Sequence, residues 1–272
     1  HLDALAILQQ AGLPLDEVGA DEGSTWGVYA AEQPGTTLVA RGTPGGWQLD
    51  GEKGWCSLAQ DLSHALVTAR LEDGSRGLFA VDLRAPGVTA DRGPWVARGL
   101  SWIVSAAVRF DAVPAVPVGD PGWYLQRPGF AWGGMGVAAC WYGGAVGIAR
   151  ALVGPDGRRE PDQLDLAQLG AADTALHGAR TALAWAAARV DDPATVPRDT
   201  PILALRTRAV VASAAETVLT RTAHALGPAP LALDEDHARR VADLQLYLRQ
   251  HHAERDDAAL GGALHDRGES PW

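Results

Sequence analysis

The stretch Gly51–Ala59 brings together residue types that could bind a flat aromatic ligand. It reads Gly-Glu-Lys-Gly-Trp-Cys-Ser-Leu-Ala and lies between two strand-like segments, 46–50 and 65–69. Alternate residues of an extended segment point the same way, so the indole of Trp55 and the hydroxyl of Ser57 can face one ligand. The indole would supply a wall and the hydroxyl a hydrogen-bond donor at the ligand's edge. The alternative is a hairpin whose tryptophan only fills the core of the sheet.

The composition indicates a globular protein and excludes several classes of partner. The chain has 272 residues, 47% hydrophobic and 21% charged, with a net charge of −10 that argues against nucleic acid or an anionic membrane as the main partner. Cys56 and Cys140 have no metal-binding or redox spacing, so we expect reduced thiols, no metal site and a cytoplasmic location. We expect the small-residue run Gly133–Ala151 to be a buried helix rather than a membrane span.

The elements that must position these residues change in character along the chain. Leu2–Gln10 predicts a short amphipathic helix that Gly12 ends. From Trp26 to Pro117, short apolar runs alternate with turn residues about every eight to twelve positions, which is typical of a small antiparallel barrel or sandwich. Beyond this region the sequence is rich in alanine with helical spacing of apolar residues, which predicts four helices at 130–153, 163–189, 202–226 and 237–260.

We therefore predict an α+β fold, in which an antiparallel β-barrel or sandwich is followed by a C-terminal four-helix bundle. The predicted parts are an N-terminal helix and loop at 1–24, the β-domain at 25–125, the helical bundle at 126–264 and a polar, frayed tail at 265–272. The apolar helices exceed what one bundle core needs, so we expect a homodimer or homotetramer that assembles through the helical domain.

The turn resembles the flavin-contacting loop of the acyl-CoA dehydrogenase superfamily, which usually reads Gly-x-Lys-x-Trp-Ile-Thr. Four further segments match motifs of that family in the same order: Tyr29–Gly35, Pro86–Val88, Gly99–Leu100 and Val108–Val113. The resemblance extends from about Trp26 to Gly261. It implies the β-domain and helical domain of this superfamily, with the usual N-terminal helical domain largely missing and only Leu2–Gln10 to represent it.

The resemblance implies FAD as the cofactor. Trp55 would pack beside the isoalloxazine ring, Ser57 would bond near its N5/O4 edge, and Cys56 lies between them in the same turn. The neighbouring Lys53, which is the only lysine, reads as a solvated charge that ends a strand.

A second loop, Tyr29–Gly35, stands where relatives have a loop over the flavin, and it offers Tyr29, Ala31 and Glu32. Glu32 replaces a threonine of typical members, and a carboxylate would be repelled by the flavin carbonyls unless it is protonated or turned away. Arg158 remains for a cofactor phosphate, but the glycine-rich turn that approaches the pyrophosphate in relatives is reduced here to Gly227. A plain Pro-Gly turn is the alternative for this loop.

The resemblance places the catalytic group near the C-terminus, where dehydrogenation beside a thioester carbonyl needs a base. Relatives usually provide a glutamate about eight residues after an Arg-Asp pair, and counting from Asp243 puts His251 at this place. Glu254 could orient the imidazole or act as the base through a kink, and Glu216 could imitate a base on the preceding helix. The alternative is a solvated helix face.

These features predict an FAD-dependent oxidoreductase acting on an acyl-CoA or related thioester. One alternative is a non-catalytic family member that serves as an assembly or binding subunit. The other is a flavin-dependent monooxygenase of the same superfamily, which His251 favours because an imidazole would suit stabilising an oxygenated flavin.

Overall fold

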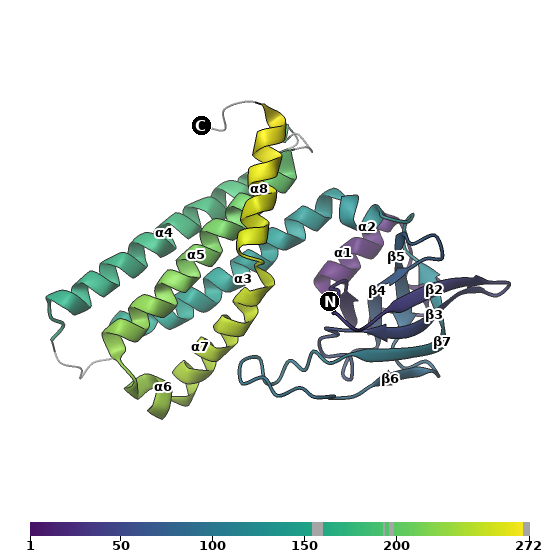
Figure 1. Ribbon diagram of the computed structural model, residues 1–272, viewed down its shortest axis with the longest axis horizontal. Helices are drawn as coiled ribbons and strands as arrows, with labels where there is room; N and C mark the ends of the chain where they lie inside the picture. Colours follow the sequence, from purple (N-terminus) through teal and green to yellow (C-terminus); the bar gives the residue numbers. More distant parts are fainter. Residues whose placement is uncertain (154–159, 193, 196–198, 269–272) are drawn as a thin grey trace. The chain divides into compact units, whose positions relative to one another are not determined.

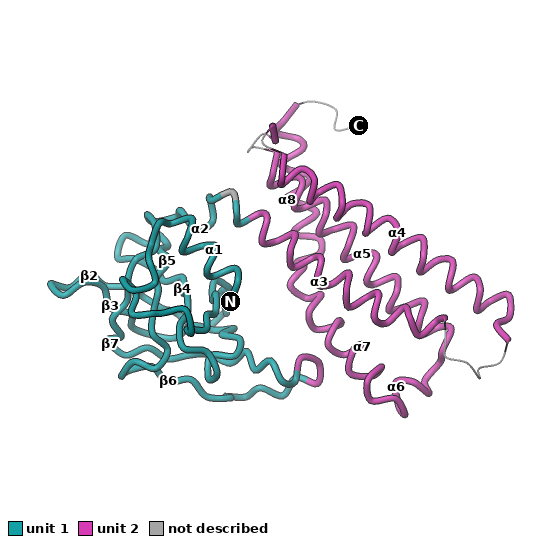
Figure 2. The backbone as a smooth tube through the Cα atoms, turned by 180° about the vertical axis from the view of Figure 1, so that it is seen from behind, with its two compact units in different colours: residues 1–97, 101–130 teal, residues 98–100, 131–272 magenta. Residues whose placement is uncertain are grey.

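The computed structural model describes residues 1–153, 160–192, 194–195 and 199–268. The chain divides into two compact units, which Figure 2 draws in different colours. Unit 1 comprises residues 1–97 and 101–130, and unit 2 comprises residues 98–100 and 131–272. Unit 1 holds the strands, whereas the described part of unit 2 is helical (Figure 1).

The described strands of unit 1 form one sheet that closes into a barrel. They are β1 (Trp26–Tyr29), β2 (Leu38–Thr43), β3 (Gly46–Lys53), β4 (His64–Arg70), β5 (Arg76–Asp82), β6 (Val88–Ala90) and β7 (Val108–Pro117). Strands β4, β2, β3, β7 and β5 pair in that order, and pairing of β5 with β4 completes the ring. β1 pairs with β4 and β6 pairs with β7. The predicted β-barrel is therefore confirmed.

Two pairings are parallel, which the prediction of an antiparallel barrel did not include. β1 runs parallel to β4, and β2 meets β4 in parallel at Val39 and Arg70. The chain between β1 and β4 contains the β2–β3 hairpin, and this gives the long connection that a parallel pair requires. The other pairings are antiparallel, as expected.

Both faces of β4 and β5 are buried, which explains their nearly uninterrupted apolar sequences. On the inner face, Val67 and Phe79 belong to the barrel core. On the outer face, Leu66 and Leu78 pack in the cluster that contains α1 (Leu2–Ala11). Gly12 ends α1 in the left-handed conformation with φ 67°, so the predicted N-terminal helix is confirmed. Two short helical segments complete unit 1, η1 (Asp16–Val18) and α2 (Trp123–Gln126).

The helical region begins with α3 and continues through unit 2 (Figure 1). Its elements are α3 (Pro128–Val153), α4 (Gln163–Asp191), α5 (Thr200–Leu226), α6 (Ala229–Leu233), α7 (Glu235–Tyr247), η3 (Leu248–Gln250) and α8 (Glu254–Arg267). α4 and α5 lie side by side, and the buried stripe of α4 consists of Ala172, Ala179 and Ala186. The small side chains allow close approach of the two helices. The first three predicted helices are confirmed, and α8 continues to Arg267, past the predicted start of the polar tail.

α3 is apolar except for Arg150, but the buried helix that we predicted is only partly buried. Trp141 and Ile148 lie in the core of unit 2, whereas Trp132 is exposed. Only 28% of the most apolar window of this helix is buried. By length and composition alone, Gly129–Val153 could cross a membrane, but core helices of soluble proteins pass the same test.

The fourth predicted helix, at 237–260, is wrong as a single element. The chain forms α7, then η3, and resumes as α8 after a break at 251–253. Ala253 adopts φ 48° and ψ −117°, a conformation that no helix accommodates. No glycine or proline marks this position in the sequence, so the break had no local signal.

The segment Arg98–Leu100, which interrupts unit 1, belongs to unit 2. The backbone N–H of Leu100 donates a hydrogen bond of 2.6 Å to the carboxylate of Asp243 on α7. A Cβ atom on Gly99 would lie 2.0 Å from the carbonyl oxygen of Ala242, so only glycine permits this approach. The Gly-Leu motif and Asp243, which the sequence placed far apart, are thus contact partners.

Candidate functional site

In unit 1 the predicted cofactor turn presents an open indole. Trp55 is 48% exposed, and its backbone has φ 59°, a conformation that is costly for a bulky residue. The hydroxyl of Ser57 lies 2.7 Å from that of Ser105. The backbone N–H groups of Cys56 and Leu58 donate to the carbonyls of Ala106 and Val104, respectively. The turn is therefore fixed by the segment before β7, and Trp55 does not fill the barrel core.

The two loops that the sequence assigned to the cofactor are joined to each other. Tyr29 is buried and donates a hydrogen bond of 3.0 Å to the carbonyl of Ser57. The side chain of Gln33 covers Gly54, where a Cβ atom would lie 2.1 Å from Oε1 of Gln33. We call the joined segments 29–35 and 54–58 the platform. The tertiary structure therefore brings together Tyr29, Trp55, Cys56 and Ser57 as predicted neighbours.

An ionic network joins Glu32 of the platform to basic side chains of the barrel. Nζ of Lys53 is 3.3 Å from Oε1 of Glu32 and donates a hydrogen bond of 2.8 Å to the hydroxyl of Thr68. Glu32 also faces Arg76 at 3.3 Å and Arg70 at 3.9 Å. The expectation that Lys53 is a solvated charge is wrong, because Lys53 is 4% exposed. Burial lowers the pKa of Lys53, and the charge of Glu32 opposes this shift.

The thiol and phenol within the platform are held in their neutral forms. Burial raises the pKa of Cys56 to about 12, although the positive charge of Lys53 opposes the shift. Burial, followed by the neighbouring Cys56, raises the pKa of Tyr29 above its ordinary value. Neither group is suited to be a nucleophile at neutral pH. Their role here is packing and hydrogen bonding.

The remaining predicted cofactor residues do not all lie in the platform. Ala31 is exposed in the platform, whereas Arg158 lies outside the described residues. Gly227 ends α5 with φ 64°, and a Cβ atom there would meet nothing within 4 Å. The platform fits a flavin, because one turn braced by hydrogen bonds carries both an exposed indole and a hydroxyl. Whether Ala31 and Glu32 contact a cofactor stays a prediction.

In unit 2 the predicted catalytic residues flank the helix break. His251 follows η3, and its side chain is 12% exposed, while Glu254 is exposed at the start of α8. The carboxylate that faces His251 belongs to Asp256, whose Oδ2 lies 3.7 Å from Nε2. Nε2 of His251 is buried and makes no hydrogen bond. Asp256 therefore takes the place that we expected for Glu254 beside the imidazole. The break moves Glu254 out of helical register with His251.

Arg208 of α5 organises the break, and the sequence analysis did not single it out. It donates hydrogen bonds of 3.0 Å to the carbonyls of Gly134 and Gln250 and lies 3.9 Å from Asp256. Its guanidinium carbon lies 4.7 Å from the ring centroid of Trp141, which also meets His251 edge-on at 6.1 Å. Trp141 of α3 contacts the imidazole directly, and Arg208 of α5 holds the backbone next to it.

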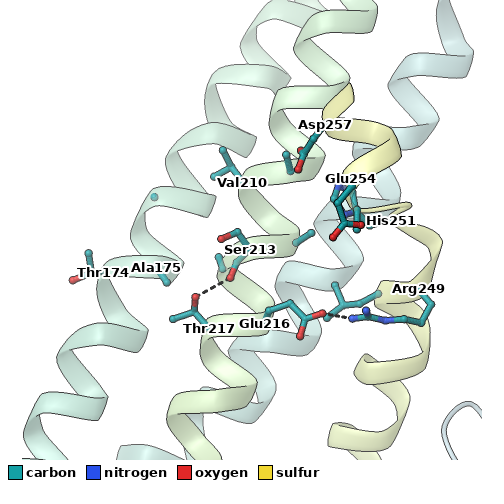
Figure 3. Close-up of a pocket in the computed structure, with 16 residues that line it drawn as sticks. Thr174, Ala175, Val210, Ser213, Glu216, Thr217, Arg249, His251, Glu254 and Asp257 are labelled. Carbon is teal, nitrogen blue, oxygen red and sulfur yellow. Dashed lines mark hydrogen bonds and ion pairs between the residues drawn. The ribbon is translucent and has the colours of Figure 1, made fainter. Parts of the chain in front are cut away.

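A groove of about 640 Å³ opens beside the break in unit 2 (Figure 3). Residues of α4, α5, η3 and α8 line it, and Ala175, Val210 and Leu248 contribute apolar surface. His251 and Glu254 lie together on one side of it (Figure 3). Glu216 lines this groove and forms an ion pair with Arg249. Among the residues described, no group of three or more His, Cys, Asp or Glu side chains is arranged to hold a metal ion.

The functional residues that sequence reasoning missed are those whose partners are distant in the chain. Lys53 was noticed as the only lysine, yet its burial depends on Glu32 and Thr68 from other segments. Arg208 sits in a regular helical pattern with no motif around it. An arginine among the buried alanines and valines of α5 was the available signal, because a charge on an apolar helix face needs a partner.

No protein-family model and no curated protein matches the sequence. Solved structures do match, 206 chains in all. The Tcur3481-Tcur3483 steroid acyl-CoA dehydrogenase (ACAD) variant is 26% identical with a TM-score of 0.73, over 99% of this chain and 76% of that chain. Methanesulfinate monooxygenase MsuC from Pseudomonas fluorescens is 20% identical with a TM-score of 0.81, over 100% and 78%. FMN-bound TdsC from Paenibacillus sp. A11-2 is 19% identical with a TM-score of 0.76, over 100% and 79%.

Proposed function

The chain has the fold of the acyl-CoA dehydrogenase superfamily, as the sequence resemblance predicted, and we propose that it is a flavin-dependent oxidoreductase. The neighbours with this fold include a dehydrogenase and monooxygenases, and one of them is described with bound FMN. The observation that carries the proposal is the platform, where the side chain of Trp55 is 48% exposed and the hydroxyl of Ser57, two residues further on, is held by Ser105. FAD is the proposed cofactor, with FMN as the alternative.

The platform would bind the isoalloxazine ring through Trp55 and Ser57. The indole would pack against the ring, and the hydroxyl would donate to its polar edge. Tyr29 holds the backbone of Ser57, so the hydroxyl is oriented before any ligand arrives. A flavin bound there would supply hydride acceptance or oxygen activation, chemistry that no side chain provides.

An acyl-CoA or related thioester is the proposed substrate, and the helix break would supply the proton acceptor. Abstraction of an α-proton needs a group that is neutral or anionic at working pH and reaches the substrate. Glu254 is exposed on the groove, and His251 lies beside it with Nε2 free of hydrogen bonds. The carboxylate of Asp256 lies 3.7 Å from Nε2 of His251.

A monooxygenase is the second candidate, and the orphan Nε2 of His251 favours it. A histidine at this place in the sequence suits oxygen chemistry, whereas a dehydrogenase base in this family is usually a carboxylate. The substitutions His251→Ala and Glu254→Gln together separate a monooxygenase from a dehydrogenase that uses Glu254. In a dehydrogenase that uses Glu254, this variant keeps reduction by the substrate, and Glu254→Gln loses it. In a monooxygenase, His251→Ala loses product formation while oxygen is still consumed.

The proposal is tested first by a visible spectrum of the purified protein, before and after incubation with FAD or FMN and desalting. About one flavin retained per chain supports the proposed function, and Trp55→Ala should release it. Anaerobic bleaching by an acyl-CoA would identify a dehydrogenase, and oxygen uptake driven by a flavin reductase would identify a monooxygenase. A protein that retains neither flavin would support the remaining alternative, a non-catalytic assembly subunit.

We also propose that the helical domain forms a homodimer or homotetramer. α4 leaves large apolar side chains exposed, with Leu164 at 72%, Leu166 at 53% and Trp185 at 55%. Such exposure along one helix is typical of an interface. Light scattering after size-exclusion chromatography would give the mass, and Trp185→Glu should shift it toward the monomer.

A further inference from the structure

We propose that Glu32 is a positioning residue of the platform, whose carboxylate fixes the 29–35 loop to three barrel strands instead of contacting the cofactor. This inference rests on the proposed flavin site, because it assigns how that site is held. It also gives a physical reason for the glutamate that stands in this loop in place of the threonine of the motif that the sequence resembles.

The carboxylate of Glu32 is surrounded by cations from three strands. Lys53 from β3 and Arg76 from β5 each approach Oε1 at 3.3 Å, and Arg70 from β4 approaches Oε2 at 3.9 Å. One acidic side chain of a loop thus faces three basic side chains of the barrel. A contact of this kind ties the loop to all three strands at once, which a threonine hydroxyl could not do.

The carboxylate of Glu32 also stabilises the three cations, because it offsets their mutual repulsion. Arg70 and Arg76 are directly opposite each other in the β4–β5 pair, and like charges in that position repel. Lys53 is 4% exposed, and a buried ammonium requires a charged or strongly polar partner. Thr68 gives Lys53 one hydrogen bond, and Glu32 supplies the negative charge. Without Glu32, the three cations would repel one another with no negative charge between them.

Glu32 lies between the two other connections of the platform. Tyr29 joins the start of the loop to Ser57, and Gln33 covers Gly54. Glu32 reaches Lys53, the residue that directly precedes Gly54. The carboxylate thus fastens the loop next to the turn that carries Trp55. Loss of this contact should loosen the loop first and the cofactor surface with it.

The test compares Glu32→Gln and Glu32→Asp with the wild type in two measurements. The first is hydrogen–deuterium exchange of the loop amides 30–35 in the flavin-free protein. The second is flavin affinity, with the visible circular dichroism of the bound flavin as the signature of its orientation. Glu72→Gln removes an exposed carboxylate from the turn between β4 and β5 and serves as the charge control. Val113→Ala lowers barrel stability without touching the network and serves as the stability control.

We expect Glu32→Gln to exchange the loop amides about tenfold faster and to bind flavin about tenfold more weakly. Glu32→Asp should recover most of both properties, and the two controls should change neither. Unchanged exchange together with weaker binding would mean that Glu32 contacts the flavin directly and would overturn the inference. Faster exchange with unchanged affinity and circular dichroism would overturn it as well. If the wild type binds no flavin, the proposed function fails, and the exchange data alone decide whether Glu32 fixes the loop.

Discussion

The two candidate regions of this protein are built in opposite ways. In unit 1, the platform consists of loops whose polar groups are paired, such as Tyr29 with Ser57 and Glu32 with Lys53. In unit 2, the helix break leaves Nε2 of His251 buried without a hydrogen bond. The platform offers an open indole to a ligand, whereas the break holds an imidazole against Trp141.

This contrast suits the platform to binding a ligand and the helix break to exchanging a proton. A surface that must hold a rigid ring benefits from satisfied, braced loops. A group that must exchange a proton benefits from an unused nitrogen close to a carboxylate, here Asp256. Substitutions in the platform should therefore affect flavin affinity, and substitutions at the break should affect helix stability and proton transfer.

The largest effect should come from Arg208→Met at the break. The change removes the donor to the carbonyls of Gly134 and Gln250 and leaves Asp256 without its arginine, which should cost about 3 kcal/mol. Thermal unfolding followed by helical circular dichroism measures the loss. Arg255→Met changes an exposed arginine on α8 and should cost far less. Equal stability of the two variants would contradict the role of Arg208 as the organiser of the break.

In the platform, substitutions at Trp55 should change flavin affinity more than stability. Its positive φ is easier for glycine, so Trp55→Gly should be about 1 kcal/mol more stable than Trp55→Ala. Both variants should lose flavin affinity because the aromatic wall is gone. Denaturant titration and flavin binding of the two variants measure this. Retained flavin in Trp55→Ala would exclude the indole as the ring's packing surface.

A smaller effect should appear at Lys53. The carboxylate of Glu32 favours the charged ammonium, so Glu32→Gln should lower the pKa of Lys53 further than burial already does. Lys53 is the only lysine, and protein labelled with ¹³C-lysine therefore gives one lysine signal to titrate by NMR. Glu72→Gln should leave that pKa unchanged. A pKa that does not move in Glu32→Gln would show that the ion pair is absent in solution.

The smallest expected effect is a difference in thiol reactivity between Cys56 in unit 1 and Cys140 in unit 2. Cys56 is buried in the platform, whereas Cys140 is exposed on α3. A thiol reagent at neutral pH should modify Cys140 in the native protein and both thiols after denaturation. Cys140→Ser is the matched control and should remove the native reaction. Rapid modification of Cys56 in that variant would mean that the platform opens readily.

The raised pKa of Cys56 also predicts how the stability of the fold changes with pH in the alkaline range. The folded state keeps the thiol protonated up to about pH 12, whereas an unfolded thiol ionises near its ordinary value of 9.0. The folded protein then binds more protons, so stability is lost as pH rises through this window. Cys56→Ala should lose less stability over the same range, as thermal unfolding at several pH values would measure.

Sequence reasoning succeeded where neighbours in the chain decide the outcome. Trp55 and Ser57 are two residues apart, and the turn that carries them was predicted with its strands. It failed for the helix predicted at 237–260, because the break at Ala253 lacks a glycine or proline and depends on Arg208 from another helix. It also failed at Lys53, since a lysine at a strand end is usually solvated and only Glu32 and Thr68 justify its burial.

The sequence by itself determined the order and type of the main elements, since apolar periodicity and turn residues are local properties. It also determined the family resemblance, through motifs of a few consecutive residues. The tertiary structure alone decided which charges meet. Glu32 reaches Arg70 and Arg76, and Asp256 rather than Glu254 faces His251. Glu32 meets its partners because the loop folds back onto strands far along the chain, and Asp256 faces His251 because the chain leaves the helical conformation at Ala253, so local periodicity predicts neither contact.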